Sequence, residues 1–375
     1  MKNLWVIFFL AVFFLTGCQK EKKIIPSGTE IKIGILAPVT GTDQRYAQQS
    51  LKGIEIIRKL KPYLHNGDKI VFVIADTHST VKGMQEALNK LQAEKVKVIL
   101  SFCGSDQMLH VKESFLKTDI PLITTLATND EIIHLSPYTT QVCMNNKTQA
   151  IVASHFIKDE KLMDNVIVLY LGDNLYSNEL AKEFITNFKQ LDGNLEGVFD
   201  LSKSENMQKF EKFDKKNIDM IFCVTNIKQS FKVMQIIDKQ HLKTQVVFSD
   251  GLISSILAKD ASKIASFEGV YAIEHFTHNL KLSSDKKIFL KNLEEEHLQQ
   301  SSYALLAYDG YVLLYDVLNE CSDGYQKKCL QAYLANMPLV KGLVGNFSIV
   351  DSQAKREVYV NKIINSQLIQ EIVTY

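Results

Sequence analysis

An alternation of apolar strands and amphipathic helices runs along the chain twice, and it restricts the possible folds more than any other feature. The first run predicts strands over residues 31–37, 70–75, 96–101 and 120–124. The second run predicts strands over residues 165–171, 195–200, 219–225 and 245–249. Continuous apolar strands separated by helices indicate parallel sheets that are covered on both faces. The sequence therefore predicts an α/β protein with two doubly wound, Rossmann-like lobes.

The ends of these strands are candidate binding segments, because ligands of open α/β sheets bind beyond the carboxyl ends of the strands. The segments are rich in hydroxyls, glycines and amides, and Arg45 is their only basic residue. They are residues 38–46, 102–105, 124–128, 171–176, 224–226 and 249–251. Such a lining favours a small polar or zwitterionic ligand over a phosphate.

No arrangement of residues in the sequence supports catalysis or a cofactor. A glycine-rich dinucleotide loop after a strand, a Walker loop and a G-x-S-x-G elbow are all missing. His297 has no second histidine at the spacing of a helical zinc site, and His275 and His278 follow a predicted strand as surface or hinge residues. We therefore expect a protein that is not an enzyme and holds no metal. An unrecognised hydrolase is a weaker hypothesis that no sequence feature supports, and it stands behind the two functions given at the end of this section.

The N-terminal segment predicts export. Lys2 precedes an apolar run from Leu4 to Leu15, which is shorter than the roughly 20 residues that cross a bilayer. We expect residues 1–17 to be a signal peptide. The end of this segment resembles a bacterial lipobox, which implies lipidation of Cys18, and the alternative is an ordinary signal with an incidental cysteine. Residues 18–29 are polar and predict a flexible tether between the lipid and the fold.

The charge balance bears on possible partners, and the cysteines bear on burial and on a possible disulfide. The chain carries 43 basic and 42 acidic residues, so its charge gives no reason to expect nucleic acid as a partner. Cys103 and Cys223 lie in apolar runs that predict burial. Cys321 and Cys329 flank a turn and could form a short disulfide, but the sequence alone leaves this open.

Several strand-end motifs, taken in order, resemble the type I periplasmic binding proteins. The resemblance is to the leucine/isoleucine/valine-binding proteins of ABC importers in particular, and it covers about residues 30–375. The motifs are Ile33–Gly41, Ala75–Asp76, Phe102–Ser105, Ile123–Thr128, Asn217–Asp219, Lys243–Gln245 with Ser249–Gly251, and Tyr308–Asp309.

The resemblance implies a three-strand hinge between the lobes. The crossovers are expected near Asn145, Ile273 and Asn346. The first lobe then contains residues 30–145 plus 274–345, and the second contains residues 146–273 plus 346–375.

The family binds an α-amino acid between its lobes, which implies roles for particular residues. Thr128 is expected to contact both the carboxylate and the amino group, and the Leu126 carbonyl to accept from the ammonium. Ser105 and the backbone at Gly104 are expected to hold the carboxylate. Asp250 is expected to pair with the ammonium, since a zwitterion that loses its hydration needs a partner for each charge.

Further residues complete the implied ligand-binding set. Tyr46 and Tyr176 are expected to shape the cleft, and Tyr303 to lie near the ligand side chain. The chain departs from the family at Gly104, where a serine is common, and at Asn226, where a tyrosine often helps to close the cleft. A branched-chain-like amino acid is the expected ligand, and a more polar amino acid, an amide or a peptide fragment stays open.

Each of the main assignments has a purely structural alternative. Asp250 could be the N-cap of the next helix, and Thr128 could cap the segment 129–135. Tyr176 could simply pack at the hinge.

Two functions are compatible with this reading. The leading hypothesis is a lipid-anchored, extracytoplasmic solute-binding protein that delivers an amino acid to an ABC permease. The alternative is a non-transport interaction or sensor lipoprotein of the same fold, such as a regulator of cell-wall synthases. The departures at Gly104 and Asn226 keep the alternative open.

Overall fold

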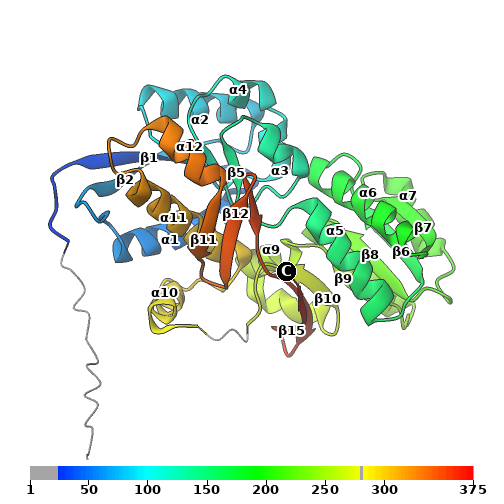
Figure 1. The fold of residues 1–375 in the computed structure, drawn as a ribbon. Helices are drawn as coiled ribbons and strands as arrows, with labels where there is room; N and C mark the ends of the chain where they lie inside the picture. Colours follow the sequence, from blue (N-terminus) through cyan, green and yellow to red (C-terminus); the bar gives the residue numbers. More distant parts are fainter. Residues whose placement is uncertain (1–23, 279–281, 375) are drawn as a thin grey trace, which may run out of the picture.

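The computed structural model describes residues 24–278 and 282–374, which form two lobes side by side (Figure 1). The predicted signal peptide, Cys18 and the start of the tether lie outside the described residues. The last residues of the predicted tether are attached to the first lobe. The Ser27 N–H donates to the Gly67 carbonyl at 2.9 Å, and its hydroxyl donates to Asp68. The ordered fold therefore begins before Glu30.

The first lobe contains an eight-stranded sheet in the order β11-β12-β13-β5-β4-β3-β1-β2. Its strands are β1 (Glu30–Ala37), β2 (Lys69–Asp76), β3 (Ile99–Ser101), β4 (Leu122–Thr124), β5 (Thr139–Gln141), β11 (Met337–Lys341), β12 (Asn346–Val350) and β13 (Gln353–Lys355). Its helices are α1 (Gln44–Leu60), α2 (Val81–Ala93), α3 (Ser105–Leu109), α4 (Lys112–Leu116), η1 (Asp130–His134), α10 (Ser284–Glu295), α11 (Ser302–Glu320) and α12 (Lys327–Ala335).

The second lobe contains a seven-stranded sheet in the order β15-β14-β10-β9-β8-β6-β7. Its strands are β6 (Asn165–Tyr170), β7 (Asn194–Asp200), β8 (Met220–Val224), β9 (Gln245–Phe248), β10 (Tyr271–Glu274), β14 (Val358–Ile364) and β15 (Gln367–Thr374). Its helices are α5 (Asn146–His155), η2 (Phe156–Glu160), α6 (Leu175–Gln190), α7 (Ser204–Lys212), α8 (Ile227–Lys239), α9 (Leu252–Asp260) and η3 (Ala261–Phe267).

The parallel parts of the two sheets have the same strand order, which confirms the predicted fold class. Both β2-β1-β3-β4-β5 and β7-β6-β8-β9-β10 follow the order of a doubly wound sheet. Helices cover both faces, so strand β8 is buried along its whole length. Helix α1 turns Ala47, Ile54 and Ile57 toward the core, as their spacing predicts. Loops after equivalent strands of the two lobes therefore meet at one cleft.

The chain crosses between the lobes three times, and the third crossover differs from the prediction. The first crossing lies between β5 and α5, and the second lies between β10 and α10. The third was expected near Asn346, but β12 and β13 belong to the first sheet, so the chain crosses only between β13 and β14. Residues 346–355 thus belong to the first lobe, because β12 pairs with β11 and β13 pairs with β5.

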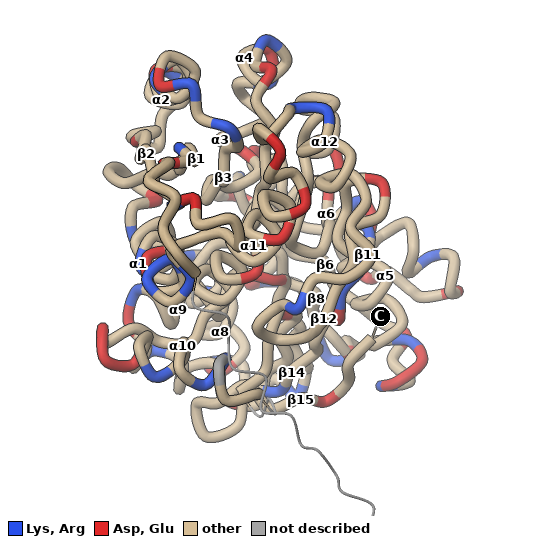
Figure 2. The backbone as a smooth tube through the Cα atoms, turned by 60° about the vertical axis from the view of Figure 1, so that its left-hand side comes forward, with Lys and Arg blue, Asp and Glu red and all other residues tan. Residues whose placement is uncertain are grey.

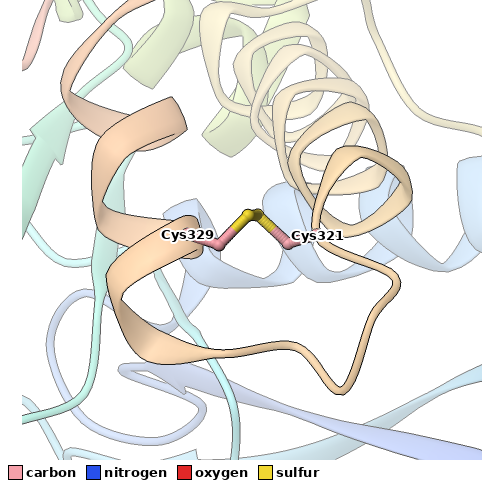
Figure 3. Close-up of a disulfide and its surroundings, with 2 residues drawn as sticks. All are labelled: Cys321 and Cys329. Atoms are coloured by element: carbon pink, nitrogen blue, oxygen red, sulfur yellow. A yellow bond between two sulfur atoms is a disulfide. The ribbon is translucent and has the colours of Figure 1, made fainter.

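A disulfide joins Cys321, at the end of α11, to Cys329 in α12 (Figure 3). The possible bridge is thereby confirmed, and Cys103 and Cys223 are buried free thiols as expected. Basic and acidic residues are interspersed over both lobes (Figure 2). None of the helices within residues 24–278 and 282–374 is long and apolar enough to cross a membrane.

Candidate functional site

A cavity of about 300 Å³ lies between the lobes, within the size range of small-molecule sites. Loops after β1, β3, β4, β6 and β9 contribute to its wall, as expected for ligand sites at strand ends. Eight of the nine residues predicted to contact a ligand line it: Tyr46, Gly104, Ser105, Leu126, Thr128, Tyr176, Asp250 and Tyr303.

Asp250 is held in one orientation by two side chains of the second lobe. Its Oδ1 accepts from the Gln149 side-chain amide at 2.6 Å and from the Tyr176 hydroxyl at 2.7 Å. Gln149 also accepts from the Asp250 N–H at 2.8 Å. Oδ2 lies 3.6 Å from Nε2 of His275, whose pKa is lowered by burial. A neutral histidine leaves the charge of Asp250 without a cationic partner.

The capping alternatives for Asp250 and Thr128 do not describe this structure. The N-cap of α9 is Gly251, which has a left-handed φ of 77° and no capping side chain. The N-cap of η1 is Asn129, whose side chain accepts from the Glu131 N–H. Asp250 and Thr128 therefore lie in the cavity wall without serving as caps.

The first lobe provides hydroxyl groups opposite Asp250. Ser105 begins α3, and its Oγ accepts from the Asn129 N–H at 3.1 Å, which leaves the hydroxyl proton free to donate elsewhere. Thr128 is almost fully buried next to the same loop. The two hydroxyls and the neighbouring backbone can satisfy a carboxylate without a buried cation.

Two aromatic rings form another side of the cavity. Tyr46 from α1 and Tyr303 from α11 stack with ring centroids 5.1 Å apart. The Tyr303 hydroxyl lies 2.5 Å from the Ser255 hydroxyl and donates to the Gly251 carbonyl at 3.2 Å. Burial raises the pKa of Tyr303 well above its ordinary value, so the ring is neutral.

Asn226 is the one predicted site residue that the cavity does not include. It is exposed, and its side chain accepts from the Gln229 N–H at 3.1 Å as the N-cap of α8. The position after β8 is correct for a strand-end residue, but the amide turns back onto its own helix.

Several cavity residues were missed by sequence reasoning. His275 follows β10 at the second crossover and faces Asp250, although it was interpreted as a surface or hinge residue. Asp43, Asp106 and Gln107 also line the cavity. Asp43 lies within a predicted strand-end segment, so a count of its carboxylates could have found it. No group of His, Cys, Asp or Glu that could hold a metal occurs in the described part of the chain.

The lobes touch on both sides of the cavity. We call the outer side the mouth contact, where Asp106 accepts from the Asn174 amide and from the Leu175 N–H at 2.7 Å, and Glu179 accepts from the Asp130 N–H at 3.1 Å. Figure 1 shows α3 beside α6 at this side.

We call the inner side the hinge contact, where the buried Glu274 carboxylate joins the lobes. It accepts from the Ser302 hydroxyl of the first lobe at 2.6 Å and from the Ser254 N–H and hydroxyl of the second lobe. Together the two contacts enclose the cavity.

A family model and a relative of known family match most of the chain and indicate the same kind of protein. A family model described as periplasmic binding protein matches residues 30–367. Leu/Ile/Val-binding protein homolog 2 of Brucella abortus (strain 2308) is 20% identical over 299 residues, which cover 78% of this chain and 79% of that protein.

Solved structures share the fold. A leucine binding protein from Thermotoga maritima MSB8 superposes with a TM-score of 0.80 at 20% identity, covering 92% of this chain and 98% of that one. A solute binding protein of an ABC transporter from Rhodopseudomonas palustris BisB5, in complex with 3,4-dihydroxy benzoic acid, superposes with a TM-score of 0.77 at 19% identity, covering 92% and 97%.

Proposed function

Because this chain belongs to the periplasmic binding protein family, we propose that it captures an α-amino acid between its lobes and delivers it to an ABC importer. The family consists of binding proteins, so the chain is not an enzyme, and membership implies a place outside the cytoplasm. The resemblance inferred from the strand-end motifs is thereby confirmed.

Asp250 is the observation that carries the choice of ligand. Its carboxylate faces the cavity, is held by Gln149 and Tyr176, and has no cation beside it. An ammonium group supplies the missing charge, whereas an aromatic acid such as the ligand of the R. palustris protein brings a second carboxylate. None of the cavity-lining residues in the described part of the chain is a lysine or arginine. The electrostatics therefore favour an α-amino acid.

The residues that line the cavity suggest which group of the ligand each of them contacts. The ammonium pairs with Asp250 and with the Leu126 carbonyl, and the carboxylate accepts from the Ser105 and Thr128 hydroxyls. These groups come from both lobes, so the ligand stabilises the closed arrangement by its higher affinity for it.

Isothermal titration calorimetry of the purified full-length protein tests the proposal. The titrants are the common α-amino acids and 3,4-dihydroxybenzoate. We expect at least one amino acid to bind, and Asp250→Ala to weaken it at least a hundredfold, because one partner of a buried pair is worth about 3–5 kcal/mol. Asp238→Ala is the matched control, since it removes an exposed carboxylate of the same lobe, on α8, that does not line the cavity. Binding of the benzoate alone, or of no titrant, contradicts the proposal.

We also propose the lipid anchor at Cys18, on the resemblance of residues 15–18 to a lipobox. Metabolic labelling with a fatty acid should modify the protein and fail with Cys18→Ser. Capture of a cell-wall synthase without an importer, from cells in which Asp250→Ala leaves function intact, supports the non-transport alternative instead.

A further inference from the structure

The charge of the cavity exceeds what a simple zwitterion can balance. Asp43, Asp106 and Asp250 all line it, and among the described residues the one imidazole in the wall is that of His275, whose pKa is lowered by burial. Arg45 is exposed and lies outside the lining. Closure around an ammonium and a carboxylate adds no net charge, so the excess of acidic groups in the cavity persists.

The two extra carboxylates lie on one wall of the first lobe. Asp43 precedes α1, and Asp106 and Gln107 lie in α3. We call these three residues the acidic wall. Gln107 donates its side-chain amide to Asp43, which fixes the two side chains together. Burial raises the pKa of both carboxyl groups, and the charges of Asp173 and Asp43 add to the upward pKa shift at Asp106. No lysine or arginine among the described residues lines the cavity beside these carboxyl groups, and His110, outside the lining, opposes the upward pKa shift of Asp106.

Two buried acceptor atoms in the cavity wall that lack a hydrogen-bond partner within the described residues also favour a ligand with N–H groups. Oε1 of Gln107 is buried and has no hydrogen-bond partner within the described residues, and it belongs to the acidic wall. Nδ1 of His275, in a side chain only 2% exposed, is also without a partner there. Buried polar atoms are nearly always paired in native proteins, so such atoms in a cavity wall indicate a ligand with N–H groups.

Asp250 does not need this second set of acceptors. Its Oδ1 is already occupied by Gln149 and Tyr176, and its Oδ2, which lies 3.6 Å from Nε2 of His275, can accept from one ammonium. The charge of Asp250 contributes to the pKa shifts of three buried groups: Tyr176, Glu274 and His275. The charge of Asp43 contributes to the pKa shifts of a different set: Tyr46, Cys103 and Asp106. The two centres of negative charge therefore act on different parts of the site.

We propose that the ligand is a basic amino acid, whose α-ammonium binds Asp250 and whose side-chain cation binds Asp43 and Gln107 of the acidic wall, since both oxygens of Asp106 accept hydrogen bonds in the mouth contact. This inference rests on the proposed function and replaces the branched-chain side chain expected from the sequence. The stacked rings of Tyr46 and Tyr303, with Leu126 and Leu306, provide an apolar surface for the methylene groups. The ring faces also attract a cation.

Calorimetry with lysine, ornithine and norleucine tests the inference, because norleucine keeps the chain length of lysine without its amine. We expect lysine or ornithine to bind at least ten times more tightly than norleucine. Asp43→Asn keeps the shape and can still accept from Gln107, and it should reduce this preference at least fivefold. Asp238→Asn, which makes the same charge change at an exposed position of α8 outside the cavity, should leave the preference unchanged.

The outcomes separate the inference from the proposed function. Binding of norleucine or leucine as tightly as lysine overturns the inference and leaves capture of an amino acid intact. A lysine preference that Asp43→Asn and Asp106→Asn both leave unchanged also overturns the assignment to the acidic wall. Failure of every amino acid, neutral or basic, to bind overturns the proposed function itself.

Discussion

The hinge contact and the mouth contact use the same chemistry, a carboxylate that accepts several N–H or O–H groups, in very different surroundings. At the hinge contact Glu274, Ser254 and Ser302 are all buried. At the mouth contact Asp106, Asp130 and Glu179 are only partly buried, and Leu175 is 38% exposed. Buried hydrogen bonds are expensive to leave unmade, whereas exposed groups exchange partners with water. The hinge contact therefore fixes the lobes, and the mouth contact is the side that can open.

A buried ion pair strengthens the hinge side further. Arg356, between β13 and β14, lies 2.8 Å from Asp309 of α11 and donates to the Val142 carbonyl after β5 at 3.1 Å. It thus connects the first and third crossovers to a first-lobe helix. No buried ion pair of this kind occurs at the mouth contact within the described residues, where Asp106, Asp130 and Glu179 accept hydrogen bonds from N–H groups.

The largest expected effect comes from breaking this ion pair. Arg356→Ala leaves Asp309 buried without its cation and should lower the free energy of unfolding by about 3–5 kcal/mol. Denaturant titration measures the change. Lys355→Ala, at the exposed neighbouring position, should stay within about 0.5 kcal/mol of the unmodified protein. A loss below about 1 kcal/mol with Arg356→Ala contradicts the picture of a fixed hinge.

The second prediction concerns pH and compares the two contacts directly. Burial raises the pKa of Glu274 to about 7, from an ordinary value of 4.5. The folded state therefore binds more protons than the unfolded state, and the free energy of unfolding falls as the pH rises from about 4.5 to 7. Glu274→Gln should remove about 3 kcal/mol of this fall, as measured by denaturation across the range.

Glu179 is the matched comparison at the mouth contact. Burial raises its pKa to about 7 as well, but the group is partly solvated and screened. Glu179→Gln should flatten the same pH dependence by much less than Glu274→Gln does. An equal or larger effect of Glu179→Gln would erase the distinction between the two contacts.

The third prediction concerns the disulfide, which lies at the far end of α11 from the hinge contact. The bridge closes a loop with a sequence separation of 8, so its removal should cost about 2.5 kcal/mol. The double variant Cys321→Ser and Cys329→Ser should unfold at lower denaturant concentration yet bind ligand with unchanged affinity. A changed affinity shows that stability and lobe closure are coupled through α11, contrary to our expectation.

The smallest effect is expected at the mouth contact. Glu179→Ala removes the acceptor of the Asp130 N–H, and one such hydrogen bond is worth about 0.5–1.5 kcal/mol. The amide exchange rate of Asp130 should rise about threefold to tenfold, while that of Ser254 at the hinge contact stays the same. Glu205→Ala removes an exposed carboxylate of α7 in the same lobe and serves as the control. Equal acceleration at Asp130 and Ser254 indicates that the two contacts open together.

The sequence predicts the fold and most of the cavity because the positions of parallel strands also determine where the loops that bind a ligand lie. Carboxyl ends of parallel strands converge, so loops such as those of Ser105 and Thr128 had to lie near Asp250. The rule places a loop but not the direction of a side chain, which is why Asn226 was assigned to the ligand and caps α8 instead.

Residues outside the strand ends could not be found in this way. Gln149 lies on helix α5 and His275 on a crossover, and neither carries a motif. The third crossover was misplaced because β12 and β13 are short strands whose sequence does not reveal which sheet they join. Strand β13 meets β5 at a single residue pair, Gln353 with Gln141.

The late third crossover has a consequence for the order of assembly. The first sheet takes its last three strands from residues 337–355, and the second takes its last two from residues 358–374. Neither sheet can be completed until almost the whole polypeptide has been synthesised, because these pairings join strands that are far apart in the chain. Both lobes therefore depend on the same last stretch of the chain, residues 337–374, to complete their sheets.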